Sequence, residues 1–301
     1  MKIISLGLWV FFFLFAGTNF TSAEYIKVAL NKKAVYQSEV LKIQLIRKST
    51  ETFTVNFLGR KYDSFLMGKC QTALIGIDYQ LKPGTYTLAG VYQAGQKFYL
   101  PIRYLIRVKE KFPVLKYNPP QRPEAEQKKI NQESEKTHQV SEKPSRKLVS
   151  LNPFVWPVKP IKANAPKVNS PFGERRCRDR IGKRKFNCRY HLGTDYRAAF
   201  DEYHNKPVEI CAINKGKVVL SDNQLMDGKI IVIDHGNGIS SGYLHLSKFL
   251  VKEGDWVRAG QKIAVAGKTG ATDAIHLHLF IKMDNGKTLI DPDKFLKMMV
   301  K

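Results

Sequence analysis

Acidic residues and cysteine are scarce in this sequence, and apolar runs are short. The 301 residues include 26 Asp and Glu against 50 Lys and Arg, which gives a formal net charge of +24. A charge of this sign favours polyanionic partners such as nucleic acid, anionic lipid or an acidic envelope polymer. No stretch after residue 23 is long and apolar enough to span a membrane, so we expect at most peripheral membrane contact.

Residues 1–23 have the pattern of a secretory signal peptide. A positive start precedes an apolar run of about 14 residues, and small residues then lead to an expected cleavage site after Ala23. The run is short for a membrane helix, although an uncleaved anchor is the alternative. No cysteine lies near the cleavage site, which excludes a lipoprotein attachment site. We therefore expect secretion across the inner membrane to the periplasm, the cell envelope or the medium. That location disfavours nucleic acid and leaves peptidoglycan or another anionic envelope polymer as the partner.

Residues 24–113 contain no histidine and consist largely of short segments, several of which alternate apolar and polar residues. This alternation, with Gly, Pro, Asn and Lys between the segments, predicts β-strands separated by turns. The segment "KPGTYTL" is typical of a turn into a late strand of an immunoglobulin-like β-sandwich. Since no group of catalytic side chains is present, we predict an Ig-like domain that binds, spaces or regulates.

The rest of the chain divides into a polar segment and a second strand-rich region. Residues 114–150 have almost no large apolar side chains, which predicts a polar linker or an exposed helix with His138 in solvent. Residues 151–301 return to short strands, and Pro292 begins a short amphipathic helix that Asp291 can cap. The predicted fold class is therefore mainly β.

Six of the seven histidines follow residue 190, in segments that include "HLGTD", "YLHLS" and "HLH". On a strand, the two histidines of "HLH" point to one face and Leu277 points to the other. Zinc binds imidazole nitrogen and carboxylate oxygen, and a catalytic zinc site uses three protein ligands plus an open position. His191, Asp195 and His278 could supply these three ligands for one Zn2+ per chain. The histidines that remain for proton transfer or oxyanion stabilisation are His245 and His276.

These motifs resemble those of the lysostaphin/LytM-type peptidases, the M23 zinc metallopeptidases of bacterial cell walls. The matching segments include "SPFGERR", "HLGTDY", "IVIDHGNG", "GYLHLS", "AIHLHLFI" and "DPDKFL". The resemblance implies an antiparallel β-sheet peptidase domain in residues 151–301, similar to a duplicated hybrid motif. It implies the same three zinc ligands, with His245 and His276 as the catalytic pair. The implied activity is hydrolysis of peptide bonds in peptidoglycan, in stem-peptide cross-links or interpeptide bridges.

The segment "RRCRDRIGKRKFNCRY" departs from the family because it is longer and more basic than usual. It is either a collar that steers anionic groups towards the zinc or a solvated loop. Cys177 and Cys188 flank its centre, and in a secreted protein we predict a disulfide between them. For Cys70 and Cys211, buried thiols and an interdomain bond are equally open.

Several other residues carry weaker predictions. His235 is expected to be structural, and Trp256 is expected in the core. The candidate substrate contacts are Arg175, Asn223, Asp227 and Tyr243, with packing as the alternative for Tyr243.

Two other classes of function stay open beside a zinc endopeptidase. A catalytically silent LytM-like module that activates a cell-wall amidase typically lacks zinc ligands, whereas all of them are present here. An envelope-binding protein would act through residues 24–113. The long segment between the two regions also motivates the hypothesis that residues 24–113 inhibit the peptidase domain.

Overall fold

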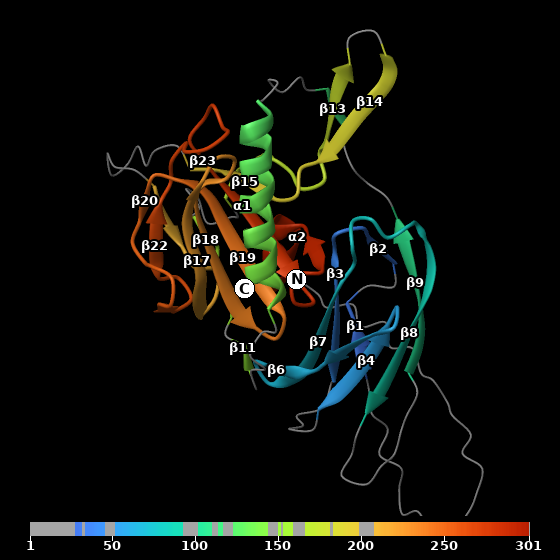
Figure 1. The fold of residues 1–301 in the computed structure, drawn as a ribbon. Helices are drawn as coiled ribbons and strands as arrows, with labels where there is room; N and C mark the ends of the chain where they lie inside the picture. The colour runs from blue at the N-terminus through green and yellow to red at the C-terminus, as the bar shows by residue number, and fades with distance from the viewer. Residues whose placement is uncertain are drawn as a thin grey trace, which may run out of the picture.

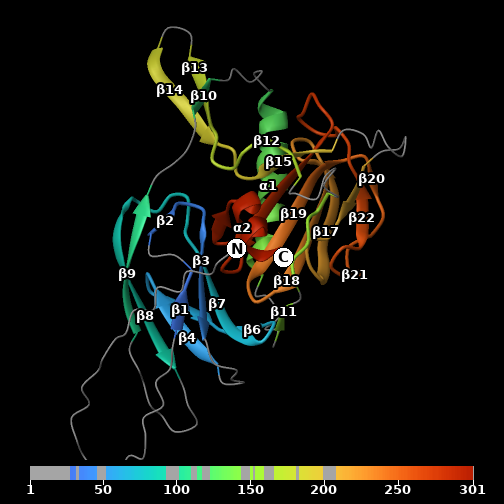
Figure 2. The same ribbon diagram turned by 180° about the vertical axis from the view of Figure 1, so that it is seen from behind.

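The computed structural model of the chain describes residues 28–31, 34–45, 52–92, 102–109, 114–116, 123–143, 150–151, 153–158, 166–180, 183–198 and 208–300. This part of the chain is mainly β with two helices, as predicted (Figures 1 and 2). The expected signal peptide lies outside the described residues. Among the described residues, no helix is long and apolar enough to cross a membrane.

The N-terminal region forms two five-stranded sheets around one core. The first sheet has the order β1 (Val28–Leu30), β3 (Val40–Leu45), β7 (Cys70–Gly76), β6 (Phe65–Met67) and β11 (Ser150–Leu151). The second has the order β2 (Ala34–Tyr36), β9 (Ile102–Lys109), β8 (Gly84–Tyr92), β4 (Phe53–Phe57) and β5 (Arg60–Asp63). Alternate residues of both sheets, including Ile43, Val55 and Ile75, are buried together between them. Two sheets around a shared core agree with a sandwich, and its immunoglobulin-like class stays a prediction.

A three-stranded ribbon projects from the rest of the described chain (Figures 1 and 2). It consists of β10 (Val114–Lys116), β13 (Arg175–Arg180) and β14 (Lys183–Tyr190). The antiparallel register pairs the Cα atoms of Cys177 and Cys188 across β13 and β14. Their side chains lie outside the described residues, so the disulfide stays a prediction.

The C-terminal region is built on an eight-stranded sheet. Its order is β12 (Val168–Ser170), β15 (Thr194–Arg197), β23 (His276–Met283), β19 (Ile239–Leu246), β18 (Gly228–Gly236), β17 (Gly216–Gln224) and β21 (Trp256–Val257), and β24 (Thr288–Ile290) pairs with β23. A small second sheet contains β16 (Glu209–Cys211), β22 (Lys262–Val265) and β20 (Lys248–Phe249). All strand pairs described within these two sheets are antiparallel, as the resemblance implies.

The two faces of β23 have different surroundings. Leu277 and Leu279 are fully buried in the main core, together with Tyr243 and Ile231. The alternate residues face the other way, and among them Phe280 lies in a separate apolar cluster with Leu220, Ile230, Val232 and Leu244. We call this second side of the sheet the outer face. It is also the face that carries His276 and His278.

Helix α1 (Glu124–Glu142) covers part of the outer face, because its Val140 packs against the apolar cluster there. Figure 1 shows α1 in front of β17, β18 and β19. The helix is polar, yet Thr137 and Ser141 are buried, and Thr137 Oγ1 lies 3.3 Å from the Gln224 side-chain oxygen. Its Lys136 forms a 2.8 Å ion pair with Asp222. The segment expected to be a linker or exposed helix therefore includes a helix docked on the C-terminal sheet.

The N-terminal and C-terminal regions share a continuous core. Val40, Phe65 and Leu74 of the first sheet pack in the same buried cluster as Phe154 and Phe295. Polar contacts add to this interface, because Arg60 and Tyr62 both reach the Asp284 carboxylate, at 3.2 and 2.9 Å. The domain boundaries stay predictions, but the two regions are fixed against each other by packing.

Some smaller expectations can also be compared with the structure. Helix α2 (Pro292–Met299) begins as predicted, with the Asp291 side chain accepting hydrogen bonds from the backbone of residues 293 and 294. The prediction that Trp256 is a core residue is wrong: it lies on edge strand β21 and is 64% exposed. Cys70 and Cys211 are thiols and form no interdomain disulfide.

Candidate metal centre

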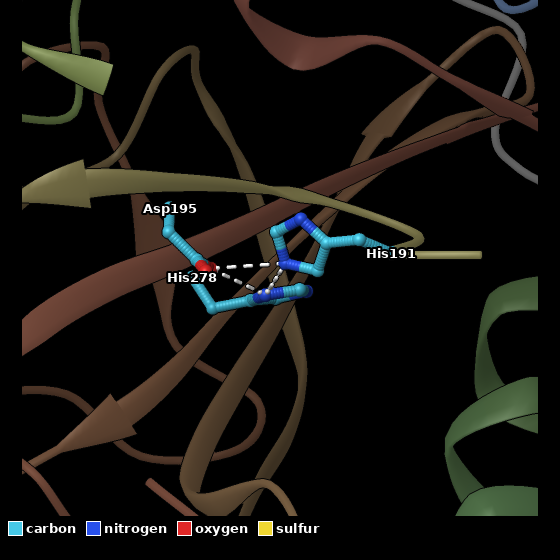
Figure 3. Close-up of side chains that lie close together, drawn as sticks. All are labelled: His191, Asp195 and His278. Carbon is cyan, nitrogen blue, oxygen red and sulfur yellow. Dashed lines mark hydrogen bonds and ion pairs between the residues drawn. The ribbon is translucent and has the colours of Figure 1, made fainter. Parts of the chain in front are cut away.

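Three side chains with metal-binding atoms meet at the edge of the outer face. Asp195 on β15 and His278 on β23 are direct partners in the antiparallel register, and His191 lies just before β15. The Asp195 Oδ1 atom is 2.8 Å from His278 Nδ1 and 3.1 Å from His191 Nε2. The two ring nitrogens are 3.0 Å apart, and Figure 3 shows the three groups pointing at one another.

The donor set fits zinc. Ligand atoms that surround a tetrahedral zinc at about 2.0–2.1 Å lie about 3.3 Å from one another, close to the separations here. Two imidazoles and one carboxylate also match the ligand types of a catalytic zinc site. Among the described residues, His191, Asp195 and His278 are the group of three that could hold a metal ion.

The tautomer of His191 is fixed by a backbone carbonyl. Its Nδ1 atom lies 2.9 Å from the carbonyl oxygen of Pro171. Because a carbonyl oxygen only accepts, Nδ1 carries the proton and Nε2 presents a lone pair to the metal position. The backbone N–H and C=O of His191 also bond to Glu174 and Gly173, at 2.9 and 2.8 Å. The turn at residues 171–174 therefore orients this candidate ligand.

A polar network holds the second oxygen of Asp195. Arg176 on β13 places Nη2 3.5 Å from Asp195 Oδ2 and 3.0 Å from Ser170 Oγ, while its Nε donates to Glu174. Burial opposes ionisation of Asp195, but the adjacent imidazoles of His191 and His278 outweigh it and lower the pKa of Asp195 below its usual value. The carboxyl group is thus held as the anion that a metal ligand requires.

His245 and His276 lie beside the three candidate ligands. The ring centroids of His245 and His276 are 4.9 Å apart, and His245 is 6.0 Å from His278. His276 Nε2 is 3.5 Å from Asp195 Oδ1. The Nδ1 atoms of both are 2.9 Å from carbonyl oxygens, those of Thr269 and Ala274. Both rings therefore keep Nε2 as the nitrogen that can accept a proton.

His245 occupies an unusual environment and backbone conformation. It is 8% exposed, and burial lowers its pKa to about 4, so the ring is neutral at pH 7. Its φ of +63° is a left-handed value that residues with a Cβ adopt rarely. Strain of this kind gathers at functional sites when surrounding bonds enforce it. Here the Asp227 carbonyl accepts from the His245 N–H at 2.9 Å.

The weaker substrate-contact predictions have different outcomes. Tyr243 is fully buried in the main core, where its hydroxyl accepts from the Ile213 N–H at 2.9 Å. This position corrects the predicted substrate contact of Tyr243 and agrees with packing. Asn223 is exposed near the end of β17 and Arg175 is half-buried on β13, and their substrate contacts stay predictions. His235 is buried between the Lys215 carbonyl and the Ser241 hydroxyl, at 2.8 and 2.7 Å, as a structural histidine would be.

Arg176 lies beside the candidate metal centre, although the sequence pattern did not single it out. The resemblance to the family favoured Arg175 as a substrate contact. Adjacent residues of a strand point to opposite faces, so Arg175 and Arg176 cannot both face Asp195. Two features of the sequence could have indicated Arg176: it alternates with Arg175 along a strand, and this strand belongs to a hairpin that connects Glu174 to His191. The backbone carbonyls that fix the histidine tautomers were not predicted either, because no side-chain pattern records them.

Two imidazoles and a carboxylate that could share a metal ion thus lie on an antiparallel sheet, with two more histidines beside them. The family model for peptidase family M23 matches residues 189–292. The chain belongs to this family, and the resemblance predicted from its motifs is confirmed. The matched range contains all five of these residues.

Individual relatives agree with this assignment. The chain is 39% identical over 88 residues to the peptidoglycan DD-endopeptidase ShyA of Vibrio cholerae, an alignment that covers 29% of this chain and 19% of ShyA. It is 40% identical over 88 residues to the lipoprotein NlpD of Yersinia enterocolitica, covering 29% of this chain and 88% of that sequence. The chain spans about a fifth of the length of the first relatives it matches.

A crystal structure of an M23 peptidase from Pseudomonas aeruginosa shares the fold. The TM-score is 0.57 at 23% identity, and the match covers 89% of this chain and 96% of the other. The likeness therefore extends beyond the peptidase domain to most of the described architecture.

Proposed function

We propose that this protein is a zinc metalloendopeptidase that hydrolyses peptide bonds in peptidoglycan. The observation that supports it most is the convergence of His191 Nε2, Asp195 Oδ1 and His278 Nδ1, which all lie within 4.8 Å of one another. These three residues would hold one Zn2+. When bound, zinc supplies a Lewis acid and lowers the pKa of a water molecule.

His245 and His276 would move the protons of the reaction. Their Nδ1–H groups are bound to Thr269 and Ala274, so each Nε2 is able to take a proton from the attacking water. The low pKa of His245 keeps its Nε2 unprotonated before reaction. Once protonated, an Nε2–H can donate to the developing oxyanion or to the leaving amine. The two neighbouring rings thus provide both the base and the donor that peptide hydrolysis needs.

The substrate proposal rests on relatives and on charge. ShyA is named as a peptidoglycan DD-endopeptidase, and a net charge of +24 suits an anionic envelope polymer. We therefore infer cleavage of stem-peptide cross-links, with the protein secreted to the periplasm or cell envelope. In a diderm wall the expected bond is the D-Ala–diaminopimelate cross-link.

The test is release of muropeptides from purified sacculi by the zinc-loaded chain, beside His278→Ala and His245→Ala. The wild type should release uncrosslinked stem peptides, and neither variant should. His278→Ala should also lose zinc in metal analysis, whereas His245→Ala should retain it because His245 is not a proposed ligand.

The same experiment separates the competing hypotheses. A wild-type chain that holds zinc and releases nothing would refute the endopeptidase. Release that appears only after addition of a cell-wall amidase would indicate an activator. Retention on sacculi without any release would indicate an envelope-binding protein.

A further inference from the structure

An aromatic side chain of the N-terminal region packs against two residues that lie next to the candidate metal centre. Tyr79 lies in the loop between β7 and β8, far in sequence from the histidines. Its ring meets Phe172 edge to face at a centroid distance of 6.4 Å, and Tyr190 at 5.6 Å. Aromatic pairs at these separations and angles are attractive beyond the area that they bury.

The two rings that Tyr79 contacts belong to the segments that orient His191. Tyr190 immediately precedes His191, and Phe172 immediately follows Pro171, whose carbonyl accepts the His191 Nδ1 proton. Phe172 is only 4% exposed. A shift of either ring would therefore move the turn that sets both the tautomer and the ring plane of this ligand.

The loop that carries Tyr79 is itself well fixed. Its Ile77 bonds to Ser38 and Glu39 through the backbone, at 2.7 and 2.9 Å. The carbonyl of Leu81 accepts from Gln37 at 2.6 Å, and the Ser38 carbonyl accepts from the Asp291 N–H at 2.8 Å. The last bond joins the turn between β2 and β3, to which Ile77 is bonded, to the start of α2 in the C-terminal region. Tyr79 is therefore held in place from both regions.

We propose that Tyr79 is a positioning residue for the metal centre, through which the N-terminal β-domain supports His191. The inference rests on the proposed zinc site. In this proposal residues 24–113 support the metal centre. The hypothesis raised from the sequence was the reverse, that these residues inhibit the peptidase domain. Loss of the Tyr79 ring should weaken metal binding rather than release an inhibited enzyme.

The experiment measures the zinc dissociation constant of the full chain by competition with a chromogenic chelator. Tyr79→Ala should raise this constant about tenfold, the lower end of the effect of removing a partner outside the ligand shell. Tyr79→Phe keeps the ring and should match the wild type. Tyr79→Leu, which fills more of the space, replaces the alanine variant if that variant does not fold, and the same weakening is expected.

The matched control is Arg60→Ala. Arg60 also crosses between the two regions, but at Asp284 and Thr288, away from the zinc ligands. It should leave the zinc dissociation constant unchanged. A Tyr79→Ala chain that binds zinc as tightly as the wild type would overturn the inference while leaving the proposed function intact. Equal weakening by Arg60→Ala would also overturn it, because the effect would then come from general domain docking. A wild-type chain without zinc affinity would refute the proposed function itself.

Discussion

Asp227 is a partly buried carboxyl group at the turn between β17 and β18, and its replacement by asparagine should stabilise the protein at neutral pH. Burial, followed by the negative charge of Glu133 on α1, raises the pKa of Asp227 to about 6, while Lys282 opposes this rise. Glu133 comes close because its carboxylate accepts the Leu225 N–H at 2.7 Å. Docking of α1 therefore places two acidic groups near each other.

The sign of the effect follows from proton linkage. The folded-state pKa of Asp227 lies above its ordinary value of 3.8, so the folded protein binds this proton more tightly than the unfolded chain. The stabilisation is fully present below pH 3.8 and is lost as the pH rises through about 6. Relative to the protonated group, ionised Asp227 lowers the free energy of unfolding by about 3 kcal/mol above pH 7, and by about half as much at pH 5.

Asparagine keeps the shape of Asp227 without its charge. We expect Asp227→Asn to raise the free energy of unfolding by about 2 kcal/mol at pH 7.5. This increase is smaller than the cost of the ionised carboxylate because the amide would make poorer hydrogen bonds at this position. At pH 5.0 the increase should be about half as large. Urea denaturation of the zinc-free chain at the two pH values measures both quantities.

The matched control is Asp222→Asn in the same hairpin. The hydrogen bond from Lys136 lowers the pKa of Asp222, so this change should not stabilise the protein at either pH. An Asp227→Asn chain that is no more stable than the wild type at pH 7.5 would refute the reasoning. A gain of equal size at both pH values would refute it too, because the effect would then not come from ionisation.

Three further predictions concern the metal centre. Gly193→Ala would drive a methyl group into the His278 ring, so the zinc dissociation constant should rise about tenfold or more by chelator competition; an unchanged constant would contradict this. Arg176→Met removes the donors to Asp195 and Ser170 and should weaken zinc binding about tenfold, with circular dichroism unchanged. Wild-type zinc affinity in this variant would show that Arg176 does not orient the carboxylate. His245→Gly and His245→Ala should both fail to release muropeptides. The glycine variant should nevertheless be about 1 kcal/mol more stable than the alanine variant in urea denaturation, because glycine adopts a φ of +63° without the strain that alanine carries there. Equal stability of the two would argue against strain at this residue.

The three candidate ligands could be selected from the sequence because strand periodicity and local motifs carry that information. In "HLH" the side-chain period of two separates the histidines from the core leucines. The register that sets Asp195 opposite His278 is a long-range pairing, and only the structure shows it. Arg176 was missed for the same reason, since its approach to Asp195 depends on how β13 lies relative to β15.

Helix α1 illustrates a different limit. Its sequence has so few apolar residues that nothing in it predicts a buried face. The contact is made instead by polar groups, such as Thr137 against Gln224 and Glu133 against the Leu225 N–H. Such pairs become visible only when both partners are placed, so residues 114–150 could be predicted as an exposed helix but not as a docked one.

The positions of Tyr243 and His245 show where strand periodicity fails. Strict alternation along β19 would put Tyr243 and His245 on the same face. In the structure Tyr243 lies in the main core, while Leu244 and His245 both lie on the outer side. The register with β18 shifts between the pairs Ile231–Tyr243 and Lys229–Leu246, as at a β-bulge. The positive φ of His245 lies within this irregular part of β19. This irregularity turns His245 out of the core and towards His276, beside the candidate metal ligands.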